Sequence, residues 1–169
     1  LGTLNYSWDF GDGNTSTSVN PTHMYDTTGI FTVVLTATSN NGCVDTDTNT
    51  VIVYPNSVAN FSAGPVCYQR DVLFRNLTTI DFGTVTYDWD FDDGAIAKVE
   101  NPTHQYTGLG TFDVYLLATS DQGCVDDTTI EVTVHPNPRA NFFALSVCAE
   151  DTMQFNDLSS IASGGLNYQ

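Results

Sequence analysis

The 169-residue chain carries 20 acidic side chains against 4 basic ones, which gives a formal net charge of −16 at pH 7. This charge excludes nucleic acid and anionic membrane surfaces as expected partners, because both would repel the chain. A hydrophobic content of 41% is enough for buried cores, but no apolar run reaches the roughly 18 residues of a membrane-spanning helix, so no direct membrane insertion is expected.

The predicted elements are short strands with alternating apolar residues, separated by turn residues. The expected strands of the central part are, in chain order, 59–63, 72–76, 85–91, 112–119 and 128–134. Alternation with a period of two is typical of a strand that buries one face. About seven short strands per 80 residues, with a Trp on a central strand, predict an all-β fold of immunoglobulin-like sandwiches.

The sequence repeats itself with a fixed 81-residue period. Trp-Asp-Phe-Gly-Asp-Gly at 8–13 returns as Trp-Asp-Phe-Asp-Asp-Gly at 89–94, and 28 of the first 55 positions are identical one period later. A fixed period of this length predicts a tandem array. The expected domains are a partial repeat that lacks its first strands at 1–55, a complete repeat at 56–137, and the first strands of another repeat at 138–169.

Both end pieces cut through a repeat in this frame, so we expect the chain to be part of a longer protein. An alternative stays open, because the pieces 1–55 and 138–169 together have about the length of one repeat. The two pieces would then complement each other between molecules and build a head-to-tail polymer.

The motifs resemble those of the PKD (polycystic kidney disease) domain family, whose marks are a Trp-Asp-Phe-Gly-Asp-Gly turn, Asn-Pro-Thr-His-x-Tyr and Gly-x-Phe-x-Val-x-Leu-x-Ala. Both copies in this chain match, with one departure, Asp92 in place of the central Gly. The resemblance covers the whole chain and implies tandem immunoglobulin-like sandwiches. The recurring Gly-Cys-Val-Asp hairpin is also similar to surface-protein arrays of Bacteroidota, which include gliding-motility adhesins exported by type IX secretion.

Five carboxylates lie at the end of the Trp-bearing strand, namely Asp9, Asp12, Asp90, Asp92 and Asp93. Clustered oxygen ligands suit Ca²⁺, and the resemblance implies the same ion, since PKD-like domains of some secreted collagenases bind calcium. The alternative, which we favour, is that each Asp accepts backbone N–H bonds and fixes a Gly-containing turn. No other cofactor is expected.

The remaining motif residues are interpreted as structural. His23 and His104 occupy equivalent positions, and no second His or Cys lies at the spacing of a zinc site. Trp8 and Trp89 alternate with apolar neighbours, which indicates a core position rather than a sugar-binding platform. The turn glycines Gly13 and Gly94 belong to the same motif.

Four cysteines fall into two positions of the repeat. Cys43 and Cys124 follow the hairpin between the last two strands, whereas Cys67 and Cys148 lie near the turn between the first two. These turns lie at opposite poles of an immunoglobulin-type sandwich, about 20 Å apart, whereas a disulfide needs Cα atoms within about 7 Å. We therefore expect disulfides between successive repeats and all four cysteines unpaired within this chain. A Cys67–Cys124 bond and free thiols stay open as alternatives.

No nucleophile elbow, zinc-protease motif or phosphate-binding loop is present, so we expect no enzyme. The first hypothesis is a non-catalytic stalk or filament of a secreted bacterial cell-surface adhesin, whose partners are neighbouring repeats and surface polysaccharide or protein ligands. Disulfides would fit such an oxidising, extracellular setting. The alternative is a carbohydrate- or protein-binding accessory module of a secreted protease or glycosidase.

Overall fold

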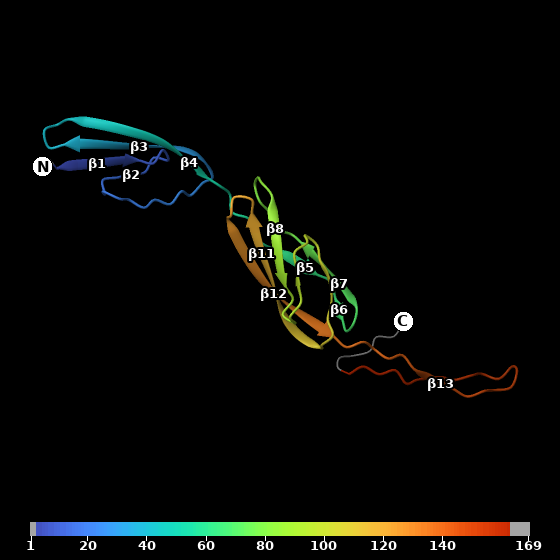
Figure 1. The fold of residues 1–169 in the computed structure, drawn as a ribbon. Coiled ribbons are helices and arrows are strands. Elements are labelled where there is room, and N and C mark those ends of the chain that lie inside the picture. The colour runs from blue at the N-terminus through green and yellow to red at the C-terminus, as the bar shows by residue number, and fades with distance from the viewer. Residues whose placement is uncertain (1–2, 163–169) are drawn as a thin grey trace. The chain divides into compact units, whose positions relative to one another are not determined.

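The computed structural model describes residues 3–162 and contains, within that range, strands but no helix (Figure 1). Its contacts divide the chain into two compact units, Leu1–Asn56 and Ser57–Gln169. Accordingly, the described residues include no helix long and apolar enough to cross a membrane. Short strands dominate because Thr, Val, Asn and Gly recur at spacings that favour pleated segments and turns.

The first unit is one antiparallel four-stranded sheet in the order β2-β1-β3-β4. Its strands are β1 (Leu4–Asp9), β2 (Thr15–Ser16), β3 (Gly29–Ser39) and β4 (Val44–Val53). The long β3–β4 hairpin keeps its register from Gly29 opposite Val53 to Thr38 opposite Val44. Gly42 closes the turn with a φ of +82°, a backbone conformation that favours glycine.

The complete repeat in the second unit is a sandwich of two sheets, in the orders β6-β12-β11-β8-β9 and β10-β7-β5. Its strands are β5 (Phe61–Ala63), β6 (Val66–Cys67), β7 (Asp71–Asn76), β8 (Val85–Asp90), β9 (Ile96–Ala97), β10 (Thr103–Gln105), β11 (Gly110–Ser120) and β12 (Val125–His135). The predicted all-β, immunoglobulin-like sandwich class is confirmed.

The core of the complete repeat lies between these two sheets and is rich in aromatic rings. Phe61 and Phe74 come from the three-stranded sheet, and their ring centroids lie 5.0 Å and 5.9 Å from that of Trp89 in the other sheet. Phe74 and Leu116 are fully buried, and Trp89 is 2% exposed. Burying a large apolar side chain contributes about 1.5–3 kcal/mol, so these contacts between the sheets hold the sandwich together.

A last hairpin follows the complete repeat. It consists of β13 (Phe142–Ala144) and β14 (Phe155–Asp157), and an isolated bridge joins Arg139 to Ser160 beyond it. Its register places Phe142 opposite Asp157 and Ala144 opposite Phe155. The β5–β7 pair has the same register one repeat earlier, with Phe61 opposite Asn76.

The strand expected at 59–63 begins only at Phe61. The N–H of Ala59 is bound by the carboxylate of Asp126 at 2.7 Å, and Val58 forms an isolated bridge with Thr79, so these residues follow a different path. The short strands β6, β9 and β10 were not predicted, because two or three residues in turn-rich segments are too few to show a period.

Candidate functional site

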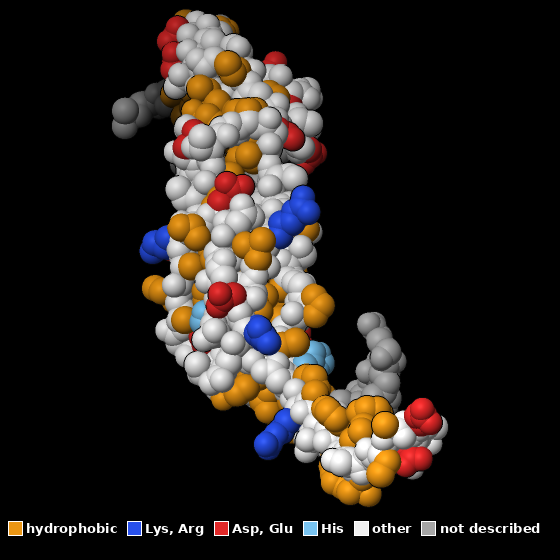
Figure 2. Space-filling view, turned by 90° about the vertical axis from the view of Figure 1, so that its right-hand side faces the viewer, with side chains coloured by type: hydrophobic (Ala, Val, Ile, Leu, Met, Phe, Trp, Pro, Cys, Tyr) orange, Lys and Arg blue, Asp and Glu red, His pale blue; other side chains and the backbone are white. Residues whose placement is uncertain are grey.

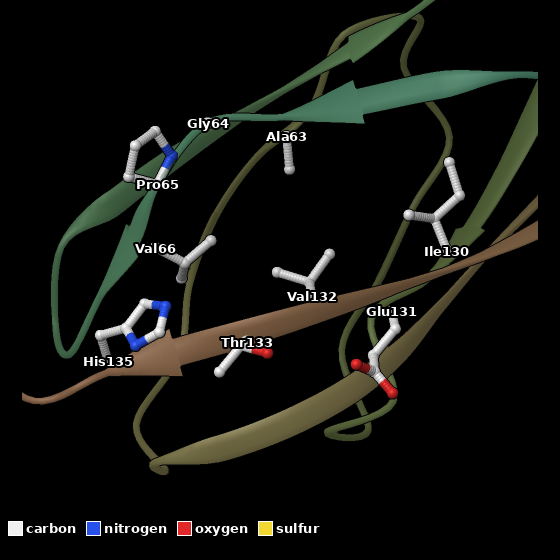
Figure 3. Close-up of a pocket in the computed structure, with 9 residues that line it drawn as sticks. All are labelled: Ala63, Gly64, Pro65, Val66, Ile130, Glu131, Val132, Thr133 and His135. Carbon is white, nitrogen blue, oxygen red and sulfur yellow. The ribbon is translucent and has the colours of Figure 1, made fainter. Parts of the chain in front are cut away.

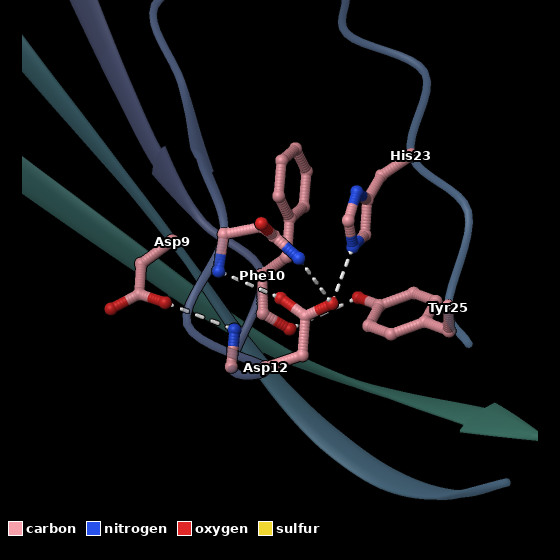
Figure 4. A network of polar contacts seen from close by, with 7 residues as sticks. Asp9, Phe10, Asp12, His23 and Tyr25 are labelled. Carbon is pink, nitrogen blue, oxygen red and sulfur yellow. Dashed lines mark hydrogen bonds and ion pairs between the residues drawn. The ribbon is translucent and has the colours of Figure 1, made fainter. Parts of the chain in front are cut away.

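The recurring turn of the first unit follows β1 and is held by two carboxylates (Figure 4). Asp9 Oδ1 accepts the N–H of Gly11 at 2.9 Å, and Asp12 accepts the backbone N–H and the side-chain amide of Asn14 at 3.0 Å and 3.1 Å. Gly11 has a φ of +79°, and a Cβ there would lie 2.5 Å from the carbonyl oxygen of Thr32. The turn therefore needs both its carboxylates and its glycine.

The complete repeat builds the same turn with an aspartate at the glycine position. Asp90 Oδ1 accepts the N–H of Asp92 at 3.0 Å, and Asp93 Oδ1 accepts that of Ala95 at 3.1 Å. Asp92 has a φ of +62° and its Oδ2 accepts the N–H of Asp113 at 3.0 Å. This bond offsets part of the cost of a left-handed backbone in a residue with a Cβ.

In each unit, a histidine contacts both a turn aspartate and an aromatic ring below the turn. In the first unit, His23 Nε2 lies 2.7 Å from Asp12 Oδ2, and the imidazole stacks on Phe10 with ring centroids 4.1 Å apart (Figure 4). Tyr25 meets the edge of the imidazole at 4.6 Å, and its hydroxyl donates to the carbonyl oxygen of Phe10 at 3.0 Å. The four side chains form one connected network.

The complete repeat has the same histidine contacts, but the buried hydroxyl of Tyr106 has no hydrogen-bond partner among the described residues. His104 Nε2 lies 2.8 Å from Asp93 Oδ2, and its ring stacks on Phe91 at 4.3 Å and meets Tyr106 edge-on at 4.6 Å. Tyr106 is fully buried. This burial, followed by the charges of Asp93 and Asp92, raises the pKa of the phenol.

The electrostatics of the first network favour an ionised Asp12. Burial alone would raise the pKa of this carboxyl, but the hydrogen bonds from Asn14 and His23 outweigh it and lower the pKa to about 2. The carboxylate is therefore charged across the neutral and mildly acidic range. The ionised Asp12 therefore remains a hydrogen-bond acceptor for the turn over this pH range.

The geometry of these residues favours the structural role over a calcium site. Each of the five carboxylates accepts a backbone N–H, and Asp12 and Asp93 also bind a histidine. Within residues 3–162, no group of three or more acidic, His or Cys side chains is placed to hold a metal ion. A hard cation needs several oxygens that converge on one point, whereas at least one oxygen of each carboxylate already accepts a separate backbone N–H.

The two tryptophans differ in their surroundings. Trp89 donates its indole N–H to the carbonyl oxygen of Val99 at 3.0 Å and lies in the core between the sheets. Trp8 makes the equivalent bond to Ser18 at 3.1 Å, yet its ring is only half-buried. The turn glycines Gly13 and Gly94 have φ values of +93° and +88° with open space around them.

The cysteines of the complete repeat lie at opposite ends of β12. Cys67 pairs with His135, the last residue of the strand, whereas Cys124 directly precedes Val125, its first residue. Eleven residues at about 3.3 Å each separate them by more than 30 Å. A bond between Cys67 and Cys124, left open by the sequence, is therefore wrong for this fold. Cys43, Cys67, Cys124 and Cys148 are all unpaired within this chain.

A groove that was not predicted from the sequence lies at the connection between β5 and β6, beside β12 (Figure 3). It holds about 430 Å³. Val132 and Ile130 point to one side of β12, whereas Thr133 and Glu131 point to the other (Figure 3). On this side, the described part of β12 pairs with β6 only at Val134 and His135. The Gly64-Pro65 pair was the available signal, because proline ends strand pairing.

Comparison with known proteins places these features in a family. The sequence model of the PKD domain matches residues 1–53 and 59–134. The pre-pro-metalloprotease PrtV of Vibrio cholerae is 34% identical over 131 residues, which are 76% of this chain and 14% of that protein. A microbial collagenase of Vibrio alginolyticus is 48% identical over 46 residues, 27% of this chain and 6% of its own length.

Among solved structures, the PKD1 domain of Vibrio anguillarum Epp is 28% identical, with a TM-score of 0.47. The alignment covers 50% of this chain and 100% of that domain. The PKD1 domain of the Vibrio cholerae metalloprotease PrtV is 25% identical, with a TM-score of 0.40. That alignment covers 48% of this chain and 98% of the domain. The chain thus spans a small fraction of the curated relatives but whole domains of the solved structures.

Proposed function

Because this chain belongs to the PKD domain family, we propose that it is an accessory module of a secreted bacterial hydrolase and holds that enzyme against a polypeptide substrate. The module itself is non-catalytic. The whole protein acts outside the cell, and its hydrolytic domain lies in a different part of the polypeptide.

The observation that carries this proposal is the match to the metalloprotease PrtV, which extends over 76% of this chain. A run of 131 residues is longer than one 81-residue repeat, so the similarity includes the tandem arrangement and not only the turn motif. Matches to three collagenases point to the same class of enzyme. These relatives favour the accessory module over an adhesin stalk.

The groove beside β12 is the surface that we assign to substrate contact. An extended polypeptide adds to a sheet edge through backbone hydrogen bonds, and neighbouring pockets take alternate side chains. The edge of β12 from Val125 to Thr133 offers the backbone groups, and the partly exposed Ile130 offers an apolar contact. The charge of −16 suits a substrate with basic residues.

Co-sedimentation of the purified chain with insoluble collagen tests the proposal. A parallel experiment with cellulose measures binding to a polysaccharide. We expect the chain to pellet with the protein polymer, and Glu131→Lys, which reverses the charge of an exposed side chain that lines the groove, to weaken this binding at least about tenfold. Leu109→Asp is the control, since Leu109 is 53% exposed and lies outside the groove. Binding to cellulose alone, or equal binding by both variants, would contradict the proposal.

The stalk of a surface adhesin is the second candidate, and the identity of 28 positions across one 81-residue period favours it. A long array multiplies one rigid module, and inter-repeat disulfides would stiffen it. The complete reading frame separates the two candidates. A protease domain beside two or three copies supports the accessory module, whereas many further copies without a hydrolase support the stalk.

A further inference from the structure

An outer hollow lies on the face of the five-stranded sheet that points away from the core of the complete repeat. It holds about 240 Å³. Its lining includes Tyr115, Leu117, Asp88, Asp90, Ile96 and Lys98. The register places Tyr115 opposite Asp90 and Leu117 opposite Asp88, so the apolar side chains of β11 lie beside the carboxylates of β8. An apolar surface with a few polar groups is typical of ligand-binding pockets.

The lining of the outer hollow distinguishes the complete repeat from the first unit. Inward positions are retained, since Trp89 and Leu116 have identical counterparts 81 residues earlier. The outward positions differ: the first unit has Val34, Thr36, Ser7, Thr15 and Thr17 where the complete repeat has, in this order, Tyr115, Leu117, Asp88, Ile96 and Lys98. Packing of the core does not require these changes, because successive residues of a strand point to opposite faces. The larger and charged side chains therefore indicate a ligand of this surface.

The charges of this outer face favour a cationic ligand. Three further outward carboxylates lie on β11 and β12, namely Asp113, Asp127 and Glu131. All three positions are threonine in the first unit. Asp113 lies directly opposite Glu131, and like charges in that arrangement weaken strand pairing. The chain has only four basic side chains, and Lys and Arg lie apart from one another on the face seen in Figure 2, so a partner has to supply further cations.

A cation of the chain itself already lies at the rim of the outer hollow. The ammonium group of Lys98 pairs with Oδ1 of Asp88. The two side chains are 74% and 46% exposed, so water screens this pair and a second cation can replace the ammonium. Asp90 uses Oδ1 to accept the N–H of Asp92, which leaves its other oxygen for a ligand. The rim therefore accepts cations and is not saturated.

We propose that the outer hollow binds an arginine side chain of a polypeptide. The inference rests on the proposed function, because it assigns a contact residue to the polypeptide substrate of the module. The guanidinium stacks on the ring of Tyr115, donates to the carboxylate of Asp90 and competes with Lys98 for Asp88. Arginine suits this surface better than lysine, because its planar group stacks on aromatic rings and donates two parallel N–H bonds to a carboxylate.

An NMR titration of the full chain with a short peptide tests the proposal. The probe is a blocked hexapeptide of alternating threonine and arginine, and matched peptides carry lysine or glutamate in place of arginine. We expect the arginine peptide to shift the backbone amide signals of Tyr115 and Leu117, and to bind at least about threefold more tightly than the lysine peptide. Absence of these shifts, or equal affinity for the lysine peptide, would overturn the assignment to arginine. The glutamate peptide should not bind.

Two substitutions remove the groups that would hold the guanidinium. Tyr115→Ala removes the stacking ring and Asp88→Asn removes a charge, and each should weaken binding of the arginine peptide at least about fivefold. Tyr115→Phe keeps the ring and should bind like the native chain. Asp81→Asn is the control for charge, since Asp81 is exposed and does not line the outer hollow. Equal weakening by Asp81→Asn would show that the peptide responds only to net charge.

A third substitution should strengthen binding. Lys98→Ala removes the ammonium that competes for Asp88, so the arginine peptide should bind at least about twofold more tightly. Lys98 is 74% exposed, and its loss should leave the fold intact. Arg75→Ala is the matched control, because it removes a positive charge from an exposed position of the other sheet. Weaker binding by Lys98→Ala, or an equal gain from Arg75→Ala, would contradict the competition.

The titration and the co-sedimentation with collagen can fail separately. If the native chain pellets with collagen but the arginine peptide causes no shift at Tyr115 and Leu117, the outer hollow is not an arginine site and the proposed function stands. If the peptide binds there but the chain does not pellet with collagen, the site stands and the proposed function is wrong. Loss of collagen binding in Tyr115→Ala, with Tyr115→Phe unaffected, would support both.

Discussion

His104 and Phe91 stack nearly parallel, with ring centroids 4.3 Å apart and planes 10° apart. Nε2 of the same imidazole lies 2.8 Å from Oδ2 of Asp93. One side chain therefore joins β10 both to the core and to the turn after β8. The imidazole is 13% exposed, so water screens this interaction only weakly.

Replacing His104 should destabilise the complete repeat and leave its fold intact. We expect His104→Ala to lower the free energy of unfolding by about 2 kcal/mol, because a charge-assisted hydrogen bond and an aromatic contact are both lost. His104→Phe keeps the stacking and should recover about half of the loss. Urea unfolding followed by tryptophan fluorescence measures both variants. An unchanged urea midpoint for His104→Ala would contradict the stabilising role of this histidine.

Acid should weaken the first unit through Asp12. The pKa of this carboxyl is about 2 in the fold, against 3.8 for an unperturbed aspartate. A group whose folded pKa is lowered stabilises the fold above the unfolded value and loses that contribution as the pH falls through the folded value. The loss therefore falls between about pH 4 and pH 2. A carboxyl titration by NMR that gave a midpoint near 3.8 would contradict this.

The aspartate that replaces the turn glycine gives a third prediction. Asp92→Ala retains the left-handed backbone and removes the acceptor for the N–H of Asp113, so it should cost about 1–2 kcal/mol. Asp92→Gly loses the same bond but relieves the strain, and should cost less. Thermal unfolding of the two variants measures the difference. An Ala variant more stable than the Gly variant would contradict this account.

Calcium should leave the chain unchanged. The carboxylates Asp9, Asp12, Asp90, Asp92 and Asp93 already accept backbone N–H bonds and do not converge. We therefore expect no heat in a calorimetric titration and no change in melting temperature, since a ligand that binds the native state would raise it. Saturable binding that Asp92→Asn abolishes would restore the calcium hypothesis.

Much of the fold was predictable because its signals are local. The period of two in β8 and β11 and the 81-residue recurrence place the strands, the central Trp89 and both turns. The link between His104 and Asp93 was not predictable in detail, since it joins positions 11 residues apart across a loop. The groove beside β12 depends on where β6 leaves the edge, which follows from packing between the sheets rather than from any short pattern.

The cysteines provide a last prediction, which concerns connectivity. Cys67 and Cys124 lie at opposite ends of β12, more than 30 Å apart along an 11-residue strand, whereas a disulfide needs Cα atoms within about 7 Å. The complete repeat thus presents one thiol at each pole, which is the placement that bonds between successive repeats require.

We therefore expect a thiol assay of the unfolded chain, purified under reducing conditions and then freed of reductant, to count four thiols per molecule. After mild oxidation, non-reducing peptide mapping should find only linkages between different molecules, and Cys67→Ser should remove the linkages that involve the pole beside His135. A Cys67–Cys124 peptide from monomeric protein would mean that β12 is not one continuous strand, and would contradict the fold as well as the connectivity.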